Sequence, residues 1–221
     1  MKFKALENNT LLCIGENQKE LSLTFFRIQE FYESQKPELR DQKFDVFNFL
    51  DVMMNEYGEL TYFADWSGFN FPDYVYEEWW NTHATGKFTE YETQLIREIA
   101  EKLDEKQKFY VIGVMEDDLE TFNHEMAHAL YYLNDEYNLE MTGLNLEFAI
   151  NHPESYNNLS AELRELGYAD SVMLDEIQAY MCSSGGWELK SDFGVNTAEA
   201  KKIIAKYRKL LRKYNTFTMD A

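Results

Sequence analysis

The length, composition and charge of the chain indicate an acidic globular protein. It has 221 residues, 45% of them hydrophobic, and its 40 acidic and 21 basic side chains give a formal net charge of −19. This hydrophobic content excludes a disordered chain. The acidic excess argues against binding to nucleic acid, because contacts to phosphate require a basic surface.

The N-terminus and the cysteines favour a cytoplasmic protein that is not embedded in a membrane. The first residues, MKFKALENN, contain no apolar segment of signal-peptide length. The longest apolar run, Phe109 to Met115, is far too short to cross a bilayer. Cys13 and Cys182 are the only cysteines, and they fit neither a disulfide framework nor a thiolate metal site. We therefore expect a reducing compartment and no membrane partner, and we keep export without a signal peptide as the alternative.

Apolar periodicity predicts a mixture of helices and strands in the first half of the chain. Helical spacing predicts a helix over 19–35 and another over 89–106. Residues 43–57 are ambiguous, with helix favoured. Residues 59–76 combine aromatic side chains with turn signals, and we interpret them as a strand or loop with buried aromatics. The β-branched and aromatic residues of 108–115 predict a short buried strand.

The second half of the chain is predicted to be almost entirely helical. A helix beginning at Asp117 and running to about Tyr137 is followed by shorter helices near 139–150, 158–167 and 171–183. A last amphipathic helix over 197–214 is strongly basic. We expect its basic side chains to pair with the acidic excess of the protein: Lys201, Lys202, Lys206, Arg208, Lys209, Arg212 and Lys213.

The helix after Asp117 contains the sequence His124-Glu125-Met126-Ala127-His128, an HExxH motif. Two histidines at i and i+4 project from one helix face about one turn apart, so both imidazoles can reach a single tetrahedral zinc ion. Glu125 points about 100° around the helix, where its carboxylate can reach a metal-bound water. The pattern predicts a zinc site.

Two stripes on this helix support the same interpretation. The first is apolar and predicts packing against a core: Phe122, Met126, Ala129 and Leu133. The second is polar and contains both histidines of the motif: His124, His128, Tyr131 and Asp135. A helix with this pattern is expected to pack on one side and to face a site on the other.

Two glutamates are candidates for the third zinc ligand. Glu176 lies on a predicted helix that is apolar on two sides, where a carboxylate is costly unless it is paired or binds a metal. Glu147 lies on the predicted helix over 139–150. We favour Glu176 and keep Glu147 as the alternative. His83 and His152 lie in turn-like segments without a supporting pattern. A metzincin is excluded because Asn134 stands where its third histidine would be.

With a glutamate on a later helix, the HEMAH motif resembles the gluzincin group of zinc metallopeptidases. The spacing of Glu147 is used by several gluzincin families, and the long insertion before Glu176 is similar to lethal-factor-like catalytic domains. The resemblance covers residues 108–184. It implies a tyrosine before the third ligand that assists catalysis, and Tyr168 is the nearest match. Thermolysin-like enzymes have an aspartate one turn beyond the ligand, where this chain has Tyr180 after Glu176 or Asn151 after Glu147.

The resemblance implies an α+β, zincin-like fold: a small sheet packed on helices, with the zinc-binding helix at the base of a cleft. Residues 1–107 would form an N-terminal mixed region integral to one domain, and 108–221 the mostly helical catalytic region. The strand at 109–115 would border the cleft and pair with an extended peptide substrate.

The function expected from the sequence is zinc-dependent hydrolysis of peptide bonds. Zinc would activate a water, Glu125 would act as the general base, and Tyr168 would donate to the developing oxyanion. Two alternative functions would use the same residues differently. In one, the ligands close a four-coordinate structural zinc site without catalysis. In the other, the chain is an acidic, zinc-stabilised interaction module with a vestigial site.

Overall fold

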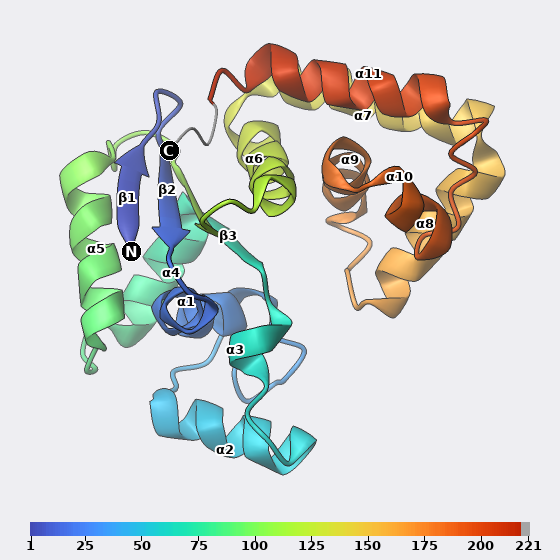
Figure 1. Ribbon diagram of the computed structural model, residues 1–221. Coiled ribbons are helices and arrows are strands. Elements are labelled where there is room, and N and C mark those ends of the chain that lie inside the picture. The colour runs from blue at the N-terminus through green and yellow to red at the C-terminus, as the bar shows by residue number, and fades with distance from the viewer. Residues whose placement is uncertain (218–221) are drawn as a thin grey trace. The chain divides into compact units, whose positions relative to one another are not determined.

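A computed structural model describes residues 1–217 of the chain, which fall into two compact units, one over Met1–Asp118 and one that begins at Leu119 (Figure 1). The first unit combines a sheet with helices, and the second consists of helices. The mixed α/β content predicted from the sequence is confirmed. Over residues 1–217, no helix combines the length and the apolar character needed to cross a membrane.

The first unit contains a four-stranded sheet and five helices within its described residues. In chain order its elements are β1 (Lys2–Ala5), β2 (Thr10–Gly15), α1 (Gln18–Glu33), α2 (Val46–Tyr57), α3 (Tyr62–Asp65), β3 (Gly68–Pro72), α4 (Asp73–His83), α5 (Glu90–Lys102) and β4 (Tyr110–Met115). The strand order is β1-β2-β4-β3, with β2 and β4 parallel and the two outer pairs antiparallel. Helix α1 packs on this sheet and on α3, α4 and α5.

The packing of α1 on the sheet depends on a close approach at Gly113 of β4. A Cβ atom at this position would lie 2.5 Å from Cε2 of Phe25, so only glycine fits without a shift of the ring. Phe25 also stacks on Phe69 of β3, with the ring centroids 5.3 Å apart. Tyr62, Phe69 and Phe71 are buried in the core as expected, whereas Trp66 and Tyr74 of the same segment are exposed.

The predicted role of the strand at 109–115 is wrong. The strand itself is confirmed, since β4 spans Tyr110–Met115. However, β4 pairs with β2 on one side and with β3 on the other. Its backbone hydrogen-bonding groups are therefore already used, and it has no edge on which an extended peptide could add a strand.

The second unit consists of α6 (Leu119–Leu133), α7 (Asp135–Asn151), α8 (Pro153–Glu165), α9 (Met173–Ser183), α10 (Gly186–Ser191) and α11 (Lys201–Tyr214). Helix α9 contacts α6, α7, α8 and α11, so it lies at the centre of this bundle (Figure 1). Two hydrogen bonds fix its position relative to α7. The hydroxyl of Tyr137 donates to Gln178 over 2.8 Å, and the amide of Asn145 donates to the carbonyl of Leu174 over 2.8 Å.

The helix that contains HExxH ends earlier than its sequence predicts. It stops at Leu133, and Asn134 begins the next helix by accepting a hydrogen bond from the backbone N–H of Tyr137 over 3.0 Å. An asparagine N-cap competes effectively with helix continuation because its side chain satisfies a free N–H. Asp135 therefore belongs to α7 and does not extend the polar stripe of α6.

Candidate metal centre

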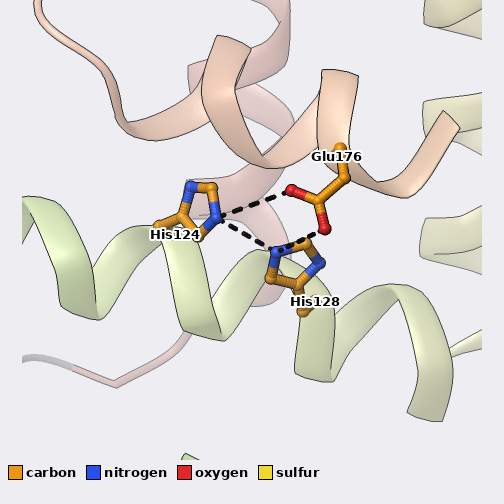
Figure 2. Close-up of side chains that lie close together, drawn as sticks. All are labelled: His124, His128 and Glu176. Atoms are coloured by element: carbon orange, nitrogen blue, oxygen red, sulfur yellow. Dashed lines mark hydrogen bonds and ion pairs between the residues drawn. The ribbon is translucent and has the colours of Figure 1, made fainter. Parts of the chain in front are cut away.

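The two motif histidines of α6 converge with Glu176 of α9. Nε2 of His128 lies 3.1 Å from Nε2 of His124. The carboxylate oxygens of Glu176 lie 3.8 Å from Nε2 of His128 and 3.9 Å from Nε2 of His124 (Figure 2). These three residues form a group whose ligand atoms lie within 4.8 Å of one another and which could hold a metal ion.

The spacing of the donor atoms is close to that of a tetrahedral zinc site. Zinc–nitrogen bonds of about 2.0–2.1 Å at tetrahedral angles place two donor atoms about 3.3 Å apart. The two Nε2 atoms are within a few tenths of an ångström of this separation. The carboxylate of Glu176 would have to move inward by about 0.5 Å to match it, a shift that side-chain rotation can provide.

The orientation of the His128 ring is fixed by Asp175. Nδ1 of His128 lies 2.9 Å from Oδ1 of Asp175. A carboxylate can only accept, so Nδ1 carries the proton and donates it. Nε2, which faces Glu176, is then the nitrogen whose lone pair is available to a metal. Both Asp175 and Glu176 lie in the first turn of α9, where the helix dipole favours negative charge.

The orientation of the His124 ring is fixed in the same way by Ser183. Nδ1 of His124 lies 3.3 Å from the Ser183 hydroxyl. That hydroxyl already donates its one hydrogen to the carbonyl of Ala179 over 2.9 Å, so it accepts from Nδ1 of His124. The neutral histidines therefore present two lone pairs to each other. Such a pair is stable only with a proton or a cation between its nitrogens.

The electrostatics of the two rings differ. Burial, with a smaller effect from the charge on His128, lowers the pKa of His124 well below its usual value. Burial also lowers the pKa of His128, but the carboxylates of Asp175 and Glu176 outweigh it and raise this pKa well above its usual value. The group thus favours one positive charge between its nitrogens, and a metal ion would take the place of that proton.

Glu125 and two tyrosines complete the surroundings of the group. Glu125 is buried, and its charge contributes to the raised pKa of His128. The ring of Tyr180 lies edge-on to His124, with the centroids 4.7 Å apart. Its hydroxyl lies 3.4 Å from the hydroxyl of Tyr168. Burial raises the pKa of Tyr180 to about 12, so its hydroxyl keeps its proton at neutral pH.

The other candidate ligands lie outside this group. Glu147 is on α7 and forms an ion pair with Lys206 of α11 over 2.5 Å. His152 lies between α7 and α8, where it packs near the ring of Phe148. His83 is not in a turn but ends α4 in the core of the first unit.

Three residues that hold or cover the group were not predicted as part of it: Asp175, Ser183 and Tyr180. Asp175 directly precedes the favoured ligand, and an acidic pair at the start of a helix is a signal that sequence inspection can use. Ser183 and Tyr180 follow Glu176 at helical spacings of seven and four residues, on or near its face. Their proximity to His124 depends on the packing of α9 against α6.

Comparison of the chain with protein-family models, with curated proteins and with solved structures found no match.

Proposed function

We propose that this protein is a zinc-dependent peptidase whose metal is held by His124, His128 and Glu176. The observation that carries the proposal is the convergence of the two Nε2 atoms and the Glu176 carboxylate, with each ring locked in the required tautomer by a second residue. A ligand set of two histidines and one glutamate is that of a class of catalytic zinc sites.

The number of donors supports a catalytic site over a structural one. Structural zinc sites have four protein ligands, whereas catalytic sites have three and leave a position for water or substrate. Among residues 1–217, the metal-binding group comprises three residues, His124, His128 and Glu176. Asp175 is engaged by Nδ1 of His128 rather than by the Nε2 side that faces the metal position. This count favours an open coordination position.

In the proposed reaction each residue has one task. A zinc ion at this position would lower the pKa of a water molecule and polarise the scissile carbonyl. Glu125, next in sequence to His124 and buried, takes a proton from the attacking water and delivers it to the leaving amine. Tyr168 donates a hydrogen bond to the oxygen of the carbonyl under attack. Tyr180 holds the Tyr168 hydroxyl by the contact between their oxygens.

A rival function is a zinc-stabilised interaction module. It uses the same ligands, so zinc content does not separate the two, and hydrolysis must be measured. The experiment compares cleavage of a peptide library, read by mass spectrometry, by the zinc-loaded protein and by Glu125→Gln. Glutamine keeps the shape of glutamate but cannot accept the proton. We expect zinc content and folding to persist while hydrolysis falls by about 10² to 10⁴.

Glu120→Gln is a matched control, because Glu120 also lies on α6 but accepts a hydrogen bond from the backbone N–H of Gly185, outside the group. This variant should cleave as the wild type does. If the zinc-loaded wild type cleaves no member of a broad library, the peptidase proposal fails and the interaction module becomes the better description.

A further inference from the structure

Helix α7 has an apolar stripe on its outer face. Leu139, Leu146 and Ile150 are 73%, 59% and 76% exposed. Together with Gly143, where an added Cβ would meet nothing within 4 Å, they follow one another at spacings of four, three and four residues. These spacings place them in one row about 16 Å long. The opposite face of α7 is also apolar but is buried, so the exposed row is a second apolar face.

Helix α11 presents a row of lysines beside this stripe. Lys202, Lys206, Lys209 and Lys213 follow the same spacings of four, three and four residues and are all exposed. Lys206 pairs with Glu147 and Lys213 pairs with Glu140, both on α7. The two ion pairs show that α7 and α11 are antiparallel neighbours. In the part of the chain that the structure describes, Lys209 forms no ion pair.

A hollow of about 430 Å³ lies between these two helices. Its apolar lining includes Gly143, Leu144 and Leu210. Its charged lining consists of Lys206, Lys209, Lys213 and Glu140, and Glu140 is the partner of Lys213. The hollow therefore combines a space for an apolar side chain with the ammonium group of Lys209, which has no ion-pair partner within residues 1–217.

We infer that the exposed faces of α7 and α11 form a docking surface for an acidic amphipathic helix of a partner protein. Its apolar side chains would cover the row from Leu139 to Ile150, and one would enter the hollow at Gly143. Its acidic side chains, along one flank, would face Lys202 and Lys209. Charge complementarity favours an acidic partner helix, because the lysine row is a local basic strip on a chain of net charge −19. The length of both rows fits about three turns of helix.

The shape of the surface decides between this occupant and an anionic membrane. An anionic bilayer attracts basic helices with exposed apolar residues, but it needs a face that protrudes into the lipid. Here the lysines border a hollow with an apolar lining, and this shape fits an inserted side chain.

The test uses a fluorescent helical peptide of about 18 residues that carries leucines at the same spacings and glutamates along one flank. Its binding to the full chain is measured by anisotropy. We expect saturable binding that weakens as salt is added. The same peptide with lysines in place of the glutamates should bind at least about tenfold more weakly.

Matched pairs of variants locate the binding. Leu146→Glu should weaken binding at least about tenfold, while Leu166→Glu, on a residue that is also 59% exposed, should not. Lys209→Glu should weaken it several-fold, while Lys201→Glu, on the same helix about 100° away from the row, should not. Circular dichroism checks that all four variants remain folded.

Three results would overturn the inference. The first is absence of saturable binding by the acidic peptide, or equal binding by its lysine counterpart. The second is sedimentation with phosphatidylserine vesicles that Leu146→Glu abolishes, which would assign the surface to a membrane. The third is concentration-dependent dimerisation that Leu146→Glu abolishes, which would assign it to a second copy of the chain.

Discussion

Asp175 accepts a hydrogen bond from Nδ1 of His128 over 2.9 Å, and this contact determines which nitrogen of the ring faces the proposed metal position. A metal-binding histidine commonly has its other nitrogen bound to a carboxylate in this way. Here the carboxylate comes from the residue that directly precedes the candidate ligand Glu176. One turn of α9 therefore supplies both the proposed ligand and the residue that orients another ligand.

Removing the Asp175 carboxylate should weaken metal binding without abolishing it. Asp175→Ala leaves all three proposed ligands in place but frees the His128 ring to rotate and to change tautomer. We expect zinc affinity to fall by about 10- to 100-fold, measured by competition with a chromophoric chelator. Asp170→Ala is the control, because Asp170 forms an exposed ion pair with Arg164. Equal affinities for both variants would remove Asp175 from the site.

The metal content of the purified protein should depend on His128. Protein prepared without chelators is expected to contain one zinc ion per chain, measured by elemental analysis. His128→Ala should lower this content to near zero, because a site with two remaining ligands binds zinc weakly. His152→Ala should retain full content, since His152 packs near Phe148 outside the group. Full zinc content in His128→Ala would rule out the proposed ligand set.

The two glutamates considered as third ligand should behave differently. Glu176→Ala should lower zinc affinity by orders of magnitude, because it removes a proposed ligand. Glu147→Ala should leave affinity almost unchanged. It should cost at most about 1 kcal/mol of stability, through the loss of an exposed ion pair with Lys206. Calorimetric titration of the metal-free variants gives both affinities. The reverse ranking would move the site to α7.

His83 should make the stability of the first unit depend on pH. Burial is the main cause that lowers the pKa of His83 to about 4, although a hydrogen bond to the Trp79 carbonyl opposes it. The unfolded chain, with an ordinary histidine pKa near 6.5, therefore binds the proton first. The contribution of neutral His83 to the free energy of unfolding is fully present above about pH 6.5 and is lost progressively as the pH falls towards 4. The loss is at most about 3 kcal/mol.

Two measurements check this pH dependence. A nuclear magnetic resonance titration should show the His83 ring protonating near pH 4. Denaturant unfolding of His83→Gln should show a smaller decrease in stability between pH 6.5 and 4 than unfolding of the wild type. A wild-type His83 that titrates near 6.5 would contradict the structure, in which the imidazole accepts from the Phe44 N–H and contacts the Trp79 carbonyl.

Several elements were predicted from local signals in the sequence, but two strands of the sheet were not. The predicted helices over 19–35 and 89–106 correspond to α1 and α5, and the predicted strand over 108–115 corresponds to β4. In contrast, β1 and β2 were missed. β2 has a local signal in its apolar run, TLLCIG, which was not used. β1 is only four residues long, three of them exposed, and it forms by pairing with β2. Pairing energy of this kind is absent from local sequence.

For the candidate site, the sequence alone determined the motif and therefore the positions of His124, Glu125 and His128 on one helix. Helical periodicity fixes that geometry, since it is local. The sequence favoured Glu176 over Glu147, but only the tertiary structure brought Glu176 to the histidines, because the distance between two helices depends on how α9 packs against α6. The same packing selected Asp175 and Ser183 as the hydrogen-bond partners of the two rings. No spacing along the chain encodes those contacts.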